Sequence, residues 1–323
     1  MMAEWIFLLP GLTLTAGLAN EDQRTPLIPY VDGEWWQVAH NPSSEETALN
    51  GGQVVDHCFL RGVDRKWRLW TQIRGTREGR LFYLWEGTED IERAQWKARG
   101  ICWKADTTVG ESQGTGREVI IQAPYVMQEE KRYVLLYGGG PVEKGGERQI
   151  CAATSTDGVA FRRSQDEKGR SRLFVGPGMA RDPMVLEIGG EYVVYYCADE
   201  GGKGVIAART SSSLLGSAWS EYVVVSEGGM LGTNSWSQQC PFVVFRDGYY
   251  YLFKMAGSDA YKTVVCRSED PLDFGKGDEK VVAILETSAS EIIVVGDRYY
   301  ISSLIPGYMG VRLTRLKWRY PLT

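Results

Sequence analysis

The sequence predicts an all-β protein, a five-bladed β-propeller. Two observations in the 323-residue chain predict this fold: five segments share one plan, and short hairpin signals recur while helical periodicity is scarce. Each segment opens on small or polar residues, continues into three or four apolar residues, turns, and ends in an aromatic-rich strand. A pair of β-sandwiches would not require five matching openings. The segments are Val54–Gly75, Ile121–Gly140, Ala180–Asp199, Gln238–Gly257 and Ser288–Gly307.

Each segment is expected to form two strands joined by a tight turn. Gly189-Gly190 and Asp247-Gly248 lie between β-branched and aromatic runs, a strong hairpin signal. A third strand is expected after each pair, which gives three or four strands per blade. These third strands are expected within Leu81–Trp96, Ile150–Phe161, Val205–Trp219, Thr263–Phe274 and Met309–Trp318.

The repeats place a single propeller domain over residues 21–323, preceded by a signal-like segment over residues 1–20. Ile6–Ala19 resembles the apolar part of a secretion signal, although Glu4 and no basic residue precede it. Removal of this segment would favour a secreted or periplasmic location, and its retention a cytoplasmic one. The segment is too short for a membrane span, so no membrane partner is expected.

Composition excludes several classes of partner and cofactor. The chain has 36 basic and 41 acidic residues, a net charge of −5, and no basic stripe, so a nucleic-acid partner is not expected. Two histidines and six scattered cysteines without a CxxC spacing give no zinc site. We therefore expect a monomer without a cofactor.

The blade openings predict where function lies. The first strand of each propeller blade lines the central channel, so equivalent openings meet at one mouth of that channel. Proline stands at the same point in three openings, at positions 124, 183 and 241, and fixes the register. Asp56 and Asp182 then occupy equivalent positions in nonadjacent blades, which predicts an acid–base site. The other residues of this ring include His57, Gln122, Arg181, Gln239 and Glu291.

At these openings the chain resembles the five-bladed propeller glycoside hydrolases of families 43, 32, 62 and 68 (arabinanases, xylosidases, invertases and levansucrases). The resemblance covers roughly residues 35–318. The Arg-Asp-Pro opening at Asp182 looks like the family's transition-state-stabilising aspartate, and Asp56 falls where the family places its base or nucleophile. The stretch ASEIIVVGDRYYIS, from Ala289, looks like the family's Ala-Pro-Glu-Ile stretch with Ser290 in place of proline. The resemblance implies hydrolysis of an oligo- or polysaccharide.

Blade four departs from the family pattern. Gln239 precedes Cys240-Pro241 where the family shows Glu-Cys-Pro or a relative, whose glutamate is the general acid. An amide has no titratable proton and cannot protonate a leaving oxygen. Three interpretations stay open: Gln239 is an inactivating replacement of a catalytic glutamate, the acid comes from elsewhere with Glu291 as the nearest candidate, or the chain is a noncatalytic carbohydrate-binding propeller.

The remaining candidates concern substrate binding. Arg74, at the end of a blade-one strand, could reach a sugar hydroxyl or a carboxylate, and Trp236 could stack on a sugar ring. His57 either lines the pocket or packs beneath it, and Gln122, Arg181 and Glu291 complete the substrate-binding set. The family often carries a calcium or sodium ion in the channel, partly organised by a blade-five histidine. Ser288 stands at that position here, so we assign no metal ligand.

Overall fold

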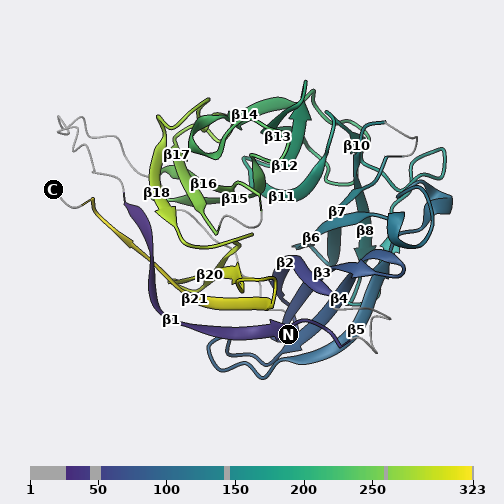
Figure 1. The fold of residues 1–323 in the computed structure, drawn as a ribbon, viewed down its shortest axis with the longest axis horizontal. Coiled ribbons are helices and arrows are strands. Elements are labelled where there is room, and N and C mark those ends of the chain that lie inside the picture. Colours follow the sequence, from purple (N-terminus) through teal and green to yellow (C-terminus); the bar gives the residue numbers. More distant parts are fainter. Residues whose placement is uncertain (1–26, 44–51, 142–145, 258–260, 322–323) are drawn as a thin grey trace, which may run out of the picture.

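Five antiparallel sheets surround a central axis in the computed structural model, which describes residues 27–43, 52–141, 146–257 and 261–321 (Figure 1). The prediction of a five-bladed β-propeller is confirmed. The described residues contain no α-helix, and only three short 3₁₀ turns interrupt the strands, at Thr107–Val109, Gly116–Glu118 and Gly229–Leu231. The signal-like segment over residues 1–20 lies outside the described residues.

In each of blades one to four, the strands are arranged in chain order from the axis outward. Blade one consists of β2 (Gln53–Arg61), β3 (Trp67–Thr76), β4 (Gly79–Gly87) and β5 (Lys97–Lys104). Blade two consists of β6 (Ile121–Glu129), β7 (Arg132–Gly139), β8 (Gln149–Ser155) and β10 (Phe174–Val175), and β9 (Arg162–Arg163) also pairs with β8. Blade three consists of β11 (Arg181–Ile188), β12 (Glu191–Glu200), β13 (Lys203–Ser211) and β14 (Val223–Glu227). Blade four consists of β15 (Gln239–Arg246), β16 (Tyr249–Met255), β17 (Thr263–Ser268) and β18 (Val281–Leu285).

Blade five is closed by a strand from the beginning of the described chain. Its own strands are β19 (Ile292–Val295), β20 (Arg298–Leu304) and β21 (Gly310–Arg319), and β1 (Ile28–His40) pairs antiparallel with β21 along its outer edge. β1 is not part of the five repeats and was not predicted, because no local turn joins it to a partner strand. This pairing closes the ring and covers an edge that would otherwise be unpaired.

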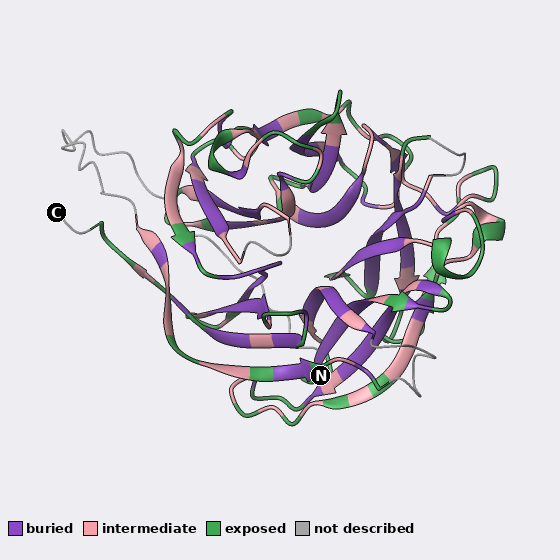
Figure 2. Cartoon of the chain, in the orientation of Figure 1, coloured by how far each residue is buried: buried purple, intermediate pink, exposed green. Residues whose placement is uncertain are grey.

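Apolar cores fill the spaces between neighbouring blades. Trp70 of blade one and Tyr137 of blade two share one core, and Tyr195 of blade three and Phe274 of blade four share another. Figure 2 shows burial concentrated on the strands near the axis and exposure on the outer strands and loops. No helix among the described residues has the length and apolar character needed to cross a membrane.

Candidate active site

A β-bulge lies at the openings of blades one to four. The pairing of the first two strands slips by one residue between Val54 and Asp56, between Gln122 and Tyr125, between Arg181 and Met184, and between Gln239 and Phe242. In blades two to five, one opening residue adopts the left-handed region, directly before proline or its blade-five counterpart Ser290. They are Ala123 (φ 43°), Asp182 (φ 53°), Cys240 (φ 50°) and Ala289 (φ 50°). Strained backbone and bulges of this kind cluster at functional sites.

The bulged openings surround a cavity of about 290 Å³ at the channel mouth, here called the mouth cavity. Seven of the nine site residues expected from the sequence line it, and they come from four blades and the loop before β15. These seven are Asp56, Arg74, Gln122, Arg181, Asp182, Trp236 and Gln239.

The two aspartates of the mouth cavity are joined through one thiol. Cys240 Sγ lies 3.7 Å from Asp56 Oδ1 and 3.8 Å from Asp182 Oδ2. Burial, and then the negative charge of Asp182, raise the pKa of Asp56 to about 7, although Arg80 and Arg181 act in the opposite direction. A carboxyl group with a pKa near 7 can accept a proton at neutral pH.

Asp182 is held from several directions. Its Oδ2 accepts hydrogen bonds from Cys197 Sγ at 3.0 Å and from the Cys240 backbone N–H at 3.3 Å, and it lies 3.5 Å from Arg181 Nε. The Arg181 side chain is only 2% exposed and lies over the Trp236 ring, 4.5 Å from its centroid. The buried pair therefore supports the fold, and it also fixes the position of a carboxylate on the cavity wall.

Gln239 lies at the cavity rim beside an exposed indole. Its Nε2 donates a 2.8 Å hydrogen bond to the backbone oxygen of Trp236, whose side chain is 48% exposed. The amide thus holds the loop that carries Trp236, and it has no proton to give to a leaving group.

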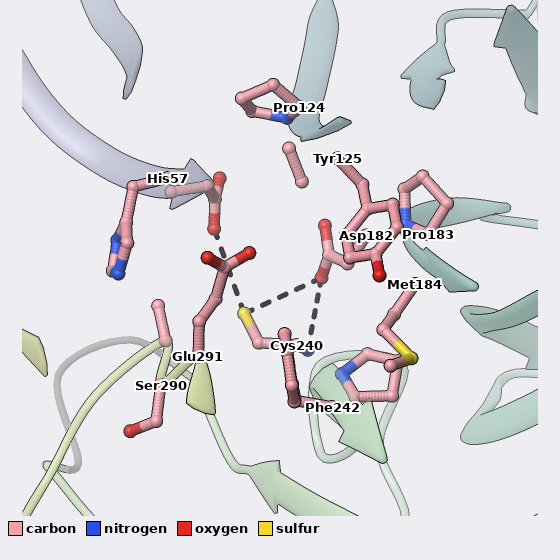
Figure 3. A pocket seen from close by; sticks show the side chains of 14 residues that line it. His57, Pro124, Tyr125, Asp182, Pro183, Met184, Cys240, Phe242, Ser290 and Glu291 are labelled. Carbon is pink, nitrogen blue, oxygen red and sulfur yellow. Dashed lines mark hydrogen bonds between the residues drawn. The ribbon is translucent and has the colours of Figure 1, made fainter. Parts of the chain in front are cut away.

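His57 and Glu291 do not line the mouth cavity. They lie further along the inner strands, around a smaller cavity of about 40 Å³ that Asp56 and Asp182 also border (Figure 3). His57 Nε2 lies 2.7 Å from Ser302 Oγ, and burial lowers the His57 pKa to about 3, which leaves the ring neutral. Glu291 Oε2 accepts a 2.8 Å hydrogen bond from the Phe59 N–H, and burial raises the Glu291 pKa to about 8.

Three residues were not identified from the sequence: Arg80 and Cys240, which line the mouth cavity, and Arg148, which is bonded to the lining residue Gln122. Arg80 is the second residue of β4, and its backbone N–H donates a 3.0 Å hydrogen bond to the carbonyl oxygen of Val119. Gly79 before it has φ +88°, and a Cβ there would lie 2.0 Å from that same oxygen, so only glycine permits this approach. Arg148 Nη1 donates to Gln122 Oε1. The repeat gave no signal for either arginine, since both come from outside the blade openings.

Among the residues described, no group of three His, Cys, Asp or Glu side chains converges as metal ligands would. Ser288 Oγ, at the position where the sequence resemblance implies a histidine, lies 3.8 Å from Met255 Sδ, which is a poor partner for a hard cation. We therefore derive no step through a metal.

No protein-family model matches the chain, and no curated protein matches it. Several solved structures, however, are similar to it in fold. A family-43 β-xylosidase/α-arabinofuranosidase from a compost microbial metagenome is 12% identical, with a TM-score of 0.60 over 90% of this chain and 96% of that one. An endo-arabinase from Bacteroides thetaiotaomicron is 14% identical (TM-score 0.60, 84% and 95% covered), and a thermostable family-43 glycoside hydrolase is 16% identical (TM-score 0.58, 83% and 89% covered). The fold of this chain is therefore that of the five-bladed propeller glycoside hydrolases.

Proposed function

We propose that this protein is a glycoside hydrolase in which Asp56 is the base that activates water, or the nucleophile, and Asp182 stabilises positive charge at the anomeric carbon. One observation carries the proposal: the buried carboxyl group of Asp182 and the partly buried one of Asp56, from nonadjacent blades, meet at one polar cavity, and the pKa of Asp56 is raised to about 7. The substrates named for the structural neighbours, arabinan and xylosides, support a carbohydrate substrate. The polar mouth disfavours a role as an apolar protein-docking scaffold.

Gln239 limits which glycosides the chain can cleave. Without a general acid, the departing oxygen must leave without a proton, which is feasible for an activated aryl group and slow for a sugar. Glu291 is a poor substitute because its carboxyl is bonded to the Phe59 N–H away from the mouth cavity. We therefore expect turnover of activated aryl glycosides and little hydrolysis of natural ones.

A noncatalytic carbohydrate-binding propeller is the second candidate. The observation that favours it is the hydrogen bond from Gln239 to the Trp236 oxygen, which holds an exposed indole at the cavity rim. Indole faces commonly stack on sugar rings. This candidate expects glycan binding without turnover, even after the substitution Gln239→Glu.

The test is turnover of 2,4-dinitrophenyl glycosides of arabinofuranose, xylose and galactose. Asp56→Asn should lower kcat/KM at least about 100-fold, since it removes the base or nucleophile. Asp64→Asn is the matched control, because Asp64 is a partly exposed blade-one aspartate that pairs with Arg68. Equal activity of the parent and Asp56→Asn would refute the assignment, and glycan binding without any turnover would favour the second candidate.

A further inference from the structure

The mouth cavity carries more positive than negative charge. Arg74, Arg80 and Arg181 line it, and Arg148 reaches it through its bond to Gln122. Asp56 and Asp182 are the only acidic side chains among the described residues that line this cavity. Three guanidinium groups thus line the cavity, with that of Arg148 beside them, against two carboxyl groups, and at neutral pH one of the two, that of Asp56, is only partly ionised because its pKa is raised to about 7.

Two of these guanidinium groups keep unused hydrogen-bond donors. Arg80 makes no side-chain hydrogen bond or ion pair with any described residue, and burial and the nearby Arg74 and Arg181 lower its pKa. Arg181 Nη2 is buried and also has no hydrogen-bond partner within the described chain. Arg181 Nη2 is out of reach of a ligand, whereas Arg80 is only partly buried and lines the cavity, so an oxyanion bound there can accept hydrogen bonds from the Arg80 guanidinium.

Neutralising the aspartates does not account for all four arginines. Arg181 already pairs with Asp182, and Arg74 is held by Gln53 Oε1 at 3.0 Å and by stacking on Tyr308, 4.2 Å from the ring centroid. Arg80 interacts with Asp56 only through space, and less so when that carboxyl is protonated. The guanidinium group of Arg80 is therefore available to a ligand in the mouth cavity.

We propose that the mouth cavity selects an anionic glycan, in which the sugar bound there, or its neighbour, carries a carboxylate or a sulfate. Guanidinium groups match these planar or tetrahedral oxyanions with paired, charge-assisted hydrogen bonds, whereas a neutral pentose offers Arg80 only hydroxyl acceptors, whose bonds are weaker. The exposed Trp236, stacked on Arg181, would contact the sugar ring. This inference rests on the proposed function, because it names the substrate class of the same site.

The test is calorimetric binding of matched oligosaccharides to the chain, whose Gln239 keeps turnover slow. The probes are oligogalacturonates with their methyl esters, glucuronoxylan oligosaccharides before and after carboxyl reduction, and sulfated galactan oligosaccharides with their desulfated forms. At least one acidic member should bind more tightly than its neutral partner, and added salt should weaken that preference. Comparison of the carboxylated probes with the sulfated ones identifies which anion the cavity prefers.

Substitutions connect the preference to the cavity. Arg80→Gln should lower the ratio of acidic to neutral affinity roughly 10- to 100-fold, the worth of a hydrogen bond to a charged group. Arg132→Gln should leave the ratio unchanged, because Arg132 pairs with Glu129 at the far end of the β6–β7 hairpin.

The outcomes separate this inference from the proposed function. Binding or hydrolysis of neutral glycans without an acidic preference overturns the inference and leaves the glycosidase proposal standing. An acidic preference that Arg80→Gln removes, without hydrolysis of any probe even after Gln239→Glu, supports the inference and overturns the glycosidase proposal. Binding of none of the probes overturns both.

Discussion

Replacing Gln239 by glutamate tests the central chemical claim about this site. The substitution keeps the shape of the side chain and adds a titratable carboxyl at the position where the sequence resemblance implies a general acid. A positioned proton donor typically contributes 10²–10⁴-fold, or about 3–5 kcal/mol of transition-state stabilisation. Hydrolysis of glycosides with poor leaving groups should therefore rise by roughly that factor.

The surroundings of Gln239 set the protonation of the new acid. The present amide donates to the Trp236 oxygen at 2.8 Å. A protonated carboxyl could make the same bond, whereas a carboxylate would face the carbonyl oxygen and be repelled, which raises the pKa. Arg181, which stacks on Trp236, acts in the opposite direction. The gain should consequently be largest at mildly acidic to neutral pH and fade toward alkaline pH.

The assay is a series of aryl glycosides whose leaving groups span a range of pKa values. The gain in kcat/KM should grow as the leaving group becomes more basic and nearly vanish for 2,4-dinitrophenol. Gln122→Glu is the matched control, because Gln122 occupies the equivalent opening position of blade two and lines the same cavity. An equal gain for all leaving groups, or the same gain from Gln122→Glu, would refute a role for position 239 in proton donation.

Three further predictions concern the buried carboxyl groups. With activated substrates, kcat/KM should rise with pH and level off above about 7, because Asp56 must be ionised, and a bell shape in the parent chain would contradict this. Asp182→Asn should cost at least about 100-fold in turnover, and thermal unfolding should show a fall of a few degrees as Arg181 loses its partner; lost stability with full turnover would make the pair purely structural. The pKa of Glu291 is raised from 4.5 to about 8, so its contribution to stability, complete below pH 4.5, is lost as pH rises through 8. Denaturant unfolding at pH 5 and pH 9 should show this loss, on the order of a few kcal/mol, in the parent, and a smaller loss in Glu291→Gln, where only the raised pKa of Asp56 still contributes over this range.

The fold could be predicted because its determinants are local and repeated. Turn dipeptides such as Gly189-Gly190 and Asp247-Gly248 do connect the first two strands of their blades. The prolines of three openings fixed the register, and the propeller axis then brought together Asp56, Asp182 and Gln239, which lie between 57 and 183 positions apart in the sequence. Closure of blade five by β1 could not be predicted this way, since its partner lies at the other end of the chain.

How far along the channel a residue lies was harder to predict than which blade carries it. Glu291 follows the opening residue Ala289 by two positions, but the left-handed backbone at Ala289 precedes it and its carboxyl is bonded to the Phe59 N–H, away from the mouth cavity. His57 likewise lies beyond the bulge, which shifts the alternation of side chains by one residue. Arg80 and Arg148 depend on how β4 and β8 approach the mouth, and only the folded chain brings them there.

The positive charge of the mouth cavity has two consequences for a carboxyl group placed at position 239. Guanidinium groups around the cavity favour ionised carboxyls and hold their pKa values down, so an acid at position 239 would be harder to keep protonated than in a neutral pocket. The same groups favour an anionic ligand, and a carboxylate at position 239 would repel it. Gln239→Glu should therefore raise the turnover of neutral aryl glycosides while lowering the affinity for acidic oligosaccharides. Calorimetry and kinetics on the one variant measure both effects, and a variant that gained affinity for the acidic probes would show that Gln239 lies outside the field of the arginines.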